Sequence, residues 1–346
     1  MEKLRKRSFL LTLILALIMC FACSTALAAE EEVGDLIYSP SAMLATDDGG
    51  MLIVDSDNHC IWKRDASGKT AIVAGVKGKA GTVDKWLPEG ADEAVGGENA
   101  LFDEIWGIAP YLNGYIITEY NPEKKHGVLR YYDPAKGVVT LKNPKDEIIT
   151  FKKPTGVTKG PDGGIFVADT GAHCIYYISA PPRDGISGAG EVTLYAGKAG
   201  TKGCADGSKK SKARFRNPMG IYYTSGKLYV ADTGNNRIVK ITDSTKKAAT
   251  IAGSTKGTEG DNIGKPTKEC RLYAPENVYY KSSTVVIADT GNSCVKVLKD
   301  GKVTRKIKES SMVNESAPVE PRGLLVVGKK LYVGDVFAKR LLSKTF

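Results

Sequence analysis

The chain has 346 residues, of which 42% are hydrophobic and 25% are charged, the composition of a globular protein. This composition excludes extensive disorder and a membrane protein with many spans. The formal net charge is +10, but the lysines are scattered, as at Lys246 and Lys247, so we expect no nucleic-acid partner. Only 3 residues are histidine, which disfavours a histidine-rich metal site.

The first 28 residues have the features of a secretory signal. Residues 3–7 are mostly basic, residues 9–22 are almost entirely apolar, and residues 26–28 read Ala-Leu-Ala, which suits a signal peptidase. The apolar run is shorter than the roughly 20 residues that span a bilayer. We therefore predict a cleaved signal peptide over 1–28, a single domain over 29–346 without a transmembrane span, and a secreted, extracellular or cell-envelope location. A lipid anchor at Cys20 or Cys23 and an uncleaved N-terminal anchor are the alternatives to free secretion.

One pattern recurs along the rest of the chain: an apolar strand, an acid, a tight turn and a second apolar strand. It occupies residues 52–61, 166–175, 229–238 and 286–295, returns in altered form at 332–341, and is interrupted by an insertion between 116 and 130. The acids of the six copies are Asp55, Glu119, Asp169, Asp232, Asp289 and Asp335. Each unit holds four short strand signals, as at 220–223, 228–231, 237–241 and 248–252.

This repeat predicts an all-β fold, a six-bladed β-propeller of four-stranded antiparallel blades. A single four-stranded sheet cannot bury both of its faces, so neighbouring blades must cover each other. The last copy has three strand signals, at 323–327, 330–334 and 340–344. We expect residues 33–39, which are strand-like, to complete that blade, because ring closure removes exposed strand edges.

Five cysteines follow the predicted signal peptide, and three of them share one position in the repeat: Cys60, Cys174 and Cys294. Equivalent positions of separate blades are too far apart for a disulfide, so we interpret these three as packing residues. A bridge between Cys204 and Cys270 is left open.

Three stretches resemble NHL repeats: the Asp-Thr-Gly-Asn-Asn-Arg-Ile turn at 232–238, Asn-Pro-Met-Gly-Ile at 217–221, and the glycine-rich residues 196–200. The resemblance extends over about residues 33–346 and implies a six-bladed fold. The family motif often has Asn-His-Arg-Ile at the turn, whereas cysteine replaces this arginine in three copies here.

The motif residues have a structural explanation. Asp and Asn side chains bind backbone groups of tight turns, and glycine permits a positive φ, so we predict that these runs shape a hairpin turn. Asp-Thr-Gly is also the signature of pepsin-like proteases, in which two carboxylates share a proton. Here three copies belong to a repeat, which disfavours a protease. The sequence has no nucleophile elbow and no zinc-protease motif, so we assign no catalytic residue.

No metal ligand is assigned either. Residues 55–58 start like a calcium loop, but the glycine and the closing glutamate of such a loop do not follow. We expect no cofactor, while calcium remains possible.

Antiparallel alternation places the turn between the second and third strands of a blade on the same face as the start of its inner strand. We call this the loop face, and loops that converge there around a channel form a concave pocket. The candidate binding residues on it are Trp106, His59, His173, Arg216, Arg237 and Arg322. We predict a secreted, monomeric, non-catalytic module that binds an extracellular protein, peptide or glycan on this face. The alternative, suggested by related propellers, is a metal-dependent enzyme of the lyase or lactonase type with its site in the central channel.

Overall fold

The computed structural model describes residues 37, 39–87, 97–181, 188–308 and 320–345. The predicted signal peptide, with Cys20 and Cys23, lies outside the described residues. So do residues 33–36 and 38 of the segment expected to complete the last blade. Among the described residues, no helix has the length and apolar character needed to cross a membrane.

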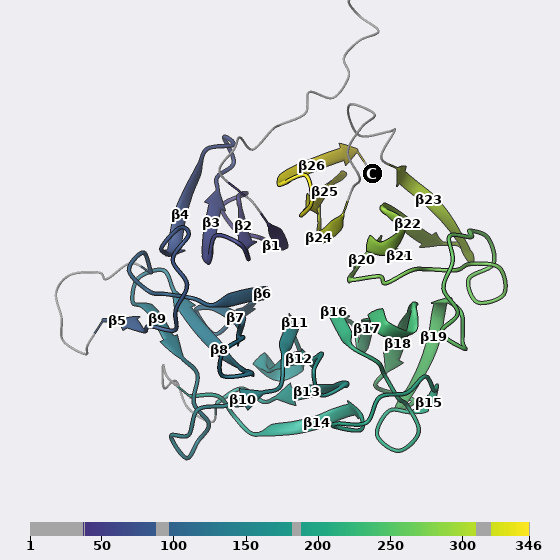
Figure 1. Ribbon diagram of the computed structural model, residues 1–346, viewed down its shortest axis with the longest axis horizontal. Helices are drawn as coiled ribbons and strands as arrows, with labels where there is room; N and C mark the ends of the chain where they lie inside the picture. Colours follow the sequence, from purple (N-terminus) through teal and green to yellow (C-terminus); the bar gives the residue numbers. More distant parts are fainter. Residues whose placement is uncertain (1–36, 38, 88–96, 182–187, 309–319, 346) are drawn as a thin grey trace, which may run out of the picture. The chain divides into compact units, whose positions relative to one another are not determined.

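Six antiparallel sheets form a ring, so the predicted six-bladed β-propeller is confirmed (Figure 1). Blade 1 consists of β1 (Pro40–Ala45), β2 (Met51–Asp55), β3 (Cys60–Arg64) and β4 (Thr70–Gly75). Blade 2 consists of β6 (Glu104–Tyr111), β7 (Gly114–Asn121), β8 (His126–Asp133) and β9 (Gly137–Thr140), with β5 (Lys85–Trp86) and β10 (Thr150–Phe151) added to it. Blade 3 consists of β11 (Pro154–Lys159), β12 (Ile165–Asp169), β13 (Cys174–Ile178) and β14 (Val192–Gly197).

The remaining three blades follow in chain order. Blade 4 consists of β16 (Pro218–Thr224), β17 (Lys227–Asp232), β18 (Arg237–Thr242) and β19 (Lys247–Gly253), with β15 (Gly207–Ser208) paired to β19. Blade 5 consists of β20 (Asn277–Lys281), β21 (Thr284–Asp289), β22 (Cys294–Lys299) and β23 (Lys302–Lys308). Blade 6 has the described strands β24 (Pro321–Val327), β25 (Lys330–Asp335) and β26 (Arg340–Thr345). Three short 3₁₀ helices lie in turns: η1 (Pro161–Gly163), η2 (Thr233–Asn235) and η3 (Thr290–Asn292).

The inner strands β1, β6, β11, β16, β20 and β24 surround the centre of the ring, each beside the next. Glycines permit this close approach. A Cβ atom on Gly107 would lie 2.4 Å from the carbonyl oxygen of Thr155 in the next blade, and one on Gly156 would lie 2.2 Å from that of Met219. Neither position has room for a side chain, so glycine at this place in the repeat fixes the width of the ring.

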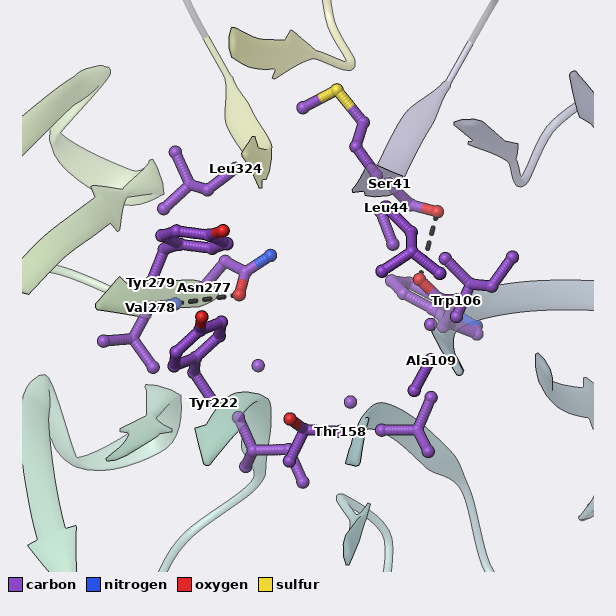
Figure 2. Close-up of a pocket in the computed structure, with 18 of the residues that line it drawn as sticks. Ser41, Leu44, Trp106, Ala109, Thr158, Tyr222, Asn277, Val278, Tyr279 and Leu324 are labelled. Atoms are coloured by element: carbon purple, nitrogen blue, oxygen red, sulfur yellow. Dashed lines mark hydrogen bonds between the residues drawn. The ribbon is translucent and has the colours of Figure 1, made fainter. Parts of the chain in front are cut away.

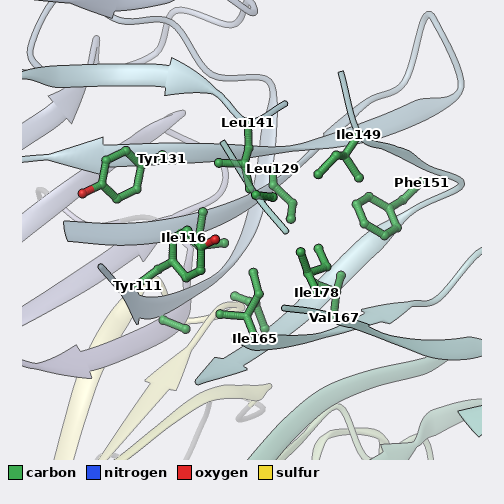
Figure 3. Close-up of a cluster of buried hydrophobic side chains, with 13 residues drawn as sticks. Tyr111, Ile116, Leu129, Tyr131, Leu141, Ile149, Phe151, Ile165, Val167 and Ile178 are labelled. Carbon is green, nitrogen blue, oxygen red and sulfur yellow. The ribbon is translucent and has the colours of Figure 1, made fainter. Parts of the chain in front are cut away.

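The core lies between blades. Figure 3 shows one cluster in which side chains of blade 2, such as Ile116 and Leu129, pack against side chains of blade 3, such as Val167 and Ile178. Successive residues of a strand point to opposite faces, so each blade contributes to the cores on both of its sides. Cys60, Cys174 and Cys294 are buried, as expected of packing residues, and none of the five described cysteines forms a disulfide, so Cys204 and Cys270 are not bridged.

The first and last blades share a core of the same kind. Ile37, only 1% exposed, belongs to one cluster with Met43 and Ile53 of blade 1 and with Leu325 and Leu341 of blade 6. The chain just before β1 therefore packs against the last blade. The fourth strand itself, expected from residues 33–39, falls mostly on residues outside the described part.

Candidate functional site

The repeated acids lie inside the blades, where the five aspartates accept hydrogen bonds from the backbone and Glu119 contacts the side chains of Thr82 and Arg130. Asp55, Asp232, Asp289 and Asp335 are 0% exposed. The amide of Arg216 donates to Asp232 over 2.8 Å, and that of Tyr273 donates to Asp289 over 2.8 Å, in each case just before an inner strand. The acids thus fix the start of the inner strand to the turn. They belong to separate blades, which fits a turn-forming role and not a protease pair.

Arg237 is one of the candidate residues, and the structure places it inside blade 4. Its side chain is fully buried, with Nε 2.8 Å from Asp232 and Nη1 2.9 Å from Asp206. Burial raises the pKa of Asp232, and the charge of Arg237 opposes this rise. Arg237 therefore stabilises the blade and does not contribute to the loop face.

In two of the three copies where cysteine replaces this arginine, another donor of the same strand reaches the acid. In blade 1, Nε1 of Trp62 donates to Asp55 over 3.1 Å. In blade 5, Nζ of Lys296 lies 2.7 Å from Asp289. Trp62 and Lys296 each follow the cysteine by two positions, which places them on the same face of the strand.

The threonines of the Asp-Thr-Gly runs join neighbouring blades. The hydroxyl of Thr170 in blade 3 donates to the carbonyl of Pro218 in blade 4 over 2.6 Å. Thr290 makes the equivalent bond from blade 5 to Pro321 of blade 6, also over 2.6 Å. The motif therefore has a second structural role, which its sequence did not reveal.

In the described part of the chain, one group of side chains has the spacing of metal ligands: Asp261, Asp289 and Cys294. The ammonium of Lys296 lies among them, 3.0 Å from Asp261 and 2.7 Å from Asp289. A fixed positive charge at this place repels a cation, so the group is an ion-pair network.

A channel with a volume of about 290 Å³ runs through the centre of the ring. Figure 2 shows Leu44, Tyr222, Tyr279 and Leu324 around it. Among the described residues that line the channel, Glu276 is the one acid and none is histidine. Protein zinc sites use three or four cysteine, histidine or carboxylate ligands, and calcium takes six to eight oxygens, so the described lining, with Glu276 alone among the charged ligands, offers few ligands to either metal.

Several polar side chains of the channel have partners within the protein. The Asn277 amide donates to the carbonyl of Arg322 over 2.9 Å and accepts from the amide of Val278 over 2.8 Å. The hydroxyl of Thr158 accepts from the amide of Tyr223 over 3.2 Å. The surface left for a ligand is consequently largely apolar.

The channel opens on the loop face beside Trp106. A second cavity of about 520 Å³ lies there, and Trp106 and Arg322 line both cavities. Two cations lie over the indole ring: Nζ of Lys153 is 4.9 Å and Cζ of Arg322 is 5.1 Å from its centroid. Nε1 of Trp106 is shielded from solvent and has no hydrogen-bond partner among the described residues. We call Trp106, Lys153 and Arg322 the mouth.

Each mouth cation also contacts an acid. Lys153 lies 3.3 Å from Glu104, and Arg322 lies 2.5 Å from Glu276 and 3.5 Å from Glu320. These pairs hold the cations over the indole. They also compensate the charge at the centre of the mouth.

The structure brings three of the six candidate residues together, since His59, Trp106 and Arg322 line the same cavity. Nδ1 of His59 lies 3.0 Å from the carbonyl oxygen of Asp103. His173 and Arg216 lie apart from them, between blades 3 and 4. Nδ1 of His173 accepts from the amide of Asn217 over 3.2 Å, and Arg216 is exposed beside Gly234.

Lys153, Glu104 and the channel tyrosines were not among the candidates. The repeat held a usable signal: the residue before the inner-strand glycine is Trp106, Thr155, Met219 or Arg322, and all four line the channel. Reading this position in every copy selects the rim of the channel. Lys153 could be found only from its contact with the indole.

Comparison with known proteins agrees with the repeat. The family model of the NHL repeat matches residues 215–241. Residues 215–241 form an NHL repeat. NHL repeat-containing protein 2 from Bos taurus is 25% identical to the chain over 281 residues, which are 71% of this chain and 37% of that protein. Protein SUPPRESSOR OF QUENCHING 1, chloroplastic, from Arabidopsis thaliana is 24% identical over 175 residues, 50% of this chain and 16% of that protein. The chain thus spans less than half the length of both relatives.

Solved structures share the fold. A structural genomics protein of unknown function from Bacteroides thetaiotaomicron aligns with a TM-score of 0.60 and 12% identity, over 91% of this chain and 72% of that one. A catalytically inactive variant of virginiamycin B lyase from Staphylococcus aureus, crystallised with quinupristin, aligns with a TM-score of 0.56 and 15% identity, over 92% and 98%. At these identities the likeness extends to the fold alone.

Proposed function

We propose that the protein is an exported, monomeric, non-catalytic module that binds a protein, peptide or glycan at the mouth of the channel. One observation carries this proposal: Lys153 and Arg322 both lie over the ring of Trp106 where a largely apolar channel opens to solvent. Tryptophan and arginine are enriched among the residues that dominate binding energy. Glu276, the one carboxylate among the described residues that line the channel, contacts Arg322, so this lining offers little to a metal-dependent catalyst. Export is supported by the basic, apolar and Ala-Leu-Ala sequence of residues 1–28.

The proposal is tested by selecting ligands and then truncating the indole. The protein is screened against a peptide-display library and a glycan array, and each hit is titrated against Trp106→Ala. We expect affinity to fall about 30-fold, the loss of a hot-spot side chain worth about 2 kcal/mol. Tyr115→Ala is the matched control, because Tyr115 is a half-buried aromatic residue in a cavity that Trp106 does not line. Ligands whose affinity is unchanged by Trp106→Ala would show that binding occurs elsewhere on the protein.

A metal analysis separates this function from the enzyme. Purified protein is analysed for bound calcium and zinc and assayed for lyase and lactonase activity, alongside Glu276→Gln. We expect substoichiometric metal and no turnover. If the protein binds stoichiometric metal, and Glu276→Gln loses both this metal and the activity, the protein is a metal-dependent enzyme and the proposed binding function is wrong.

A further inference from the structure

The channel is suited to one uncharged apolar group. Its volume of about 290 Å³ exceeds the roughly 150 Å³ of an apolar cavity that holds benzene, so a large aromatic side chain has room. The polar side chains of Ser41, Thr158 and Asn277 are bonded within the protein. Most of the lining side chains are apolar, so a sugar would bury most of its hydroxyl groups without partners, which is costly. The lining thus favours an aromatic side chain over a glycan.

The loop face beside the channel is positively charged on one side. Lys152, Lys202 and Arg216 are exposed on blades 3 and 4, and in the described part of the chain none of them forms an ion pair. We call these three residues the basic arc. A Cβ atom on Gly171 would lie 2.9 Å from Cβ of Lys152, and the amide of Gly200 donates to the carbonyl of Ala172 over 2.8 Å. Lys152 and the segment that contains Lys202 therefore lie beside the turn of blade 3. The acids Asp57, Glu104, Glu276 and Glu320 belong to other blades.

The arc lies within a short reach of the channel. Lys152 precedes the channel residue Thr155 by three positions, and Arg216 precedes Met219 by three. Three residues of extended chain span about 10 Å. Acidic residues next to an inserted side chain can therefore reach the basic arc.

We propose that the loop face binds a peptide segment of a partner protein, whose aromatic side chain enters the channel past Trp106 while adjacent acidic residues contact Lys152, Lys202 and Arg216. This inference rests on the proposed function and names the class of ligand. Charge complementarity sets the orientation of the peptide, and the buried ring supplies most of the affinity.

The first experiment is a selection from a display library of random peptides. We expect enriched sequences to share one aromatic residue next to Asp or Glu. The consensus peptide is then synthesised together with versions in which the aromatic residue is Ala or the acids are Gln or Asn. Each change should weaken binding at least about 10-fold, and only the version that keeps its acids should depend strongly on salt.

Paired variants of the protein locate the two contacts. Leu44→Trp fills the channel at a half-exposed position, and Ile148→Trp is its control at an exposed outer loop. The triple variant K152E/K202E/R216E reverses the basic arc. Its control K210E/K246E/K247E makes the same change in charge where the outer strands β15 and β19 meet. We expect Leu44→Trp and the arc variant to lose binding of the consensus peptide at least about 10-fold, and both controls to retain it.

The outcomes distinguish this inference from the proposed function. Ligands that depend on Trp106 but lack the aromatic and acidic pattern, glycans included, would overturn the peptide class and leave the binding function standing. If free N-acetyltryptophan binds as tightly as the consensus peptide, the ligand is a small aromatic acid and not a peptide. Binding that depends on neither Trp106 nor Leu44 would overturn both proposals.

Discussion

At the scale of single residues, the copies of the repeat share a buried acid and differ in the donor that contacts it. Every copy buries an acid, and a buried carboxylate requires a cation or several hydrogen bonds. Arg237 supplies the cation in blade 4, Lys296 does so in blade 5, and the indole of Trp62 serves in blade 1. The sequence showed that cysteine replaces arginine, but the donor two positions later becomes evident only when the strand is built.

The pairing of Arg237 with Asp232 should be evident in how the stability of Arg237→Met depends on pH. Removing the cation leaves Asp232 buried and unpaired, which costs about 3–5 kcal/mol. Burial already raises the pKa of Asp232, and without the charge of Arg237 this pKa rises further. Below the raised pKa the carboxyl is protonated and the cost is small, whereas above it the charged form destabilises the fold. The loss of unfolding free energy should therefore be larger at pH 8 than at pH 5.

Urea denaturation of Arg237→Met at the two pH values measures this difference. The double variant R237M/D232N, which removes both charges, should recover part of the stability and lose the pH dependence. A loss in Arg237→Met that is equal at both pH values would mean that Arg237 acts through packing alone.

At the scale of elements, the strand pattern predicted the blades well. The strands expected at 323–327, 330–334 and 340–344 appear as β24, β25 and β26 with nearly the same bounds. The two-residue strands β5, β10 and β15 were not foreseen, because they lie in polar connectors and are defined only by their partners β9, β8 and β19. The sequence did not predict the hydrogen bonds from Thr170 and Thr290 to the next blade, because these bonds also depend on partners that are distant in the sequence.

Thr290→Val tests the bond between blades 5 and 6. The change removes the hydroxyl and leaves the carbonyl of Pro321 without this donor, at a cost of about 1–3 kcal/mol. Thermal or urea unfolding should show this loss. Thr304→Val, at an exposed position of β23, should change stability little. Equal stability of the two variants would show that the threonine contributes no net energy to the joint.

At the scale of the whole molecule, the ring depends on contact between its first and last blades. Ile37 precedes β1 and packs with Leu325 and Leu341 of blade 6. The six copies of the repeat predicted the number of blades, in agreement with the family resemblance, and the missing strand signal in the last copy suggested how the ring closes. Closure brings together residues almost three hundred positions apart in sequence.

Ile37→Ala should therefore destabilise the whole fold. A large-to-small change at a residue that is 1% exposed costs about 2–5 kcal/mol. Chemical denaturation should show one cooperative transition shifted to lower denaturant, because loss of the closing contact weakens the entire ring. Leu112→Ala, at a residue that is 46% exposed, is the control. A normal midpoint for Ile37→Ala would show that the ring closes without this contact.

The sequence by itself determined the repeat, the order and type of the strands, and the turn chemistry of the buried acids. These depend on local periodicity and short spacings, which a sequence displays directly. Only the tertiary structure decided that Arg237 lies inside a blade, that Lys153 and Arg322 meet over Trp106, and that the channel is apolar. Trp106, Lys153 and Arg322 come from three different blades, and curvature of the ring, which no local pattern encodes, brings them together.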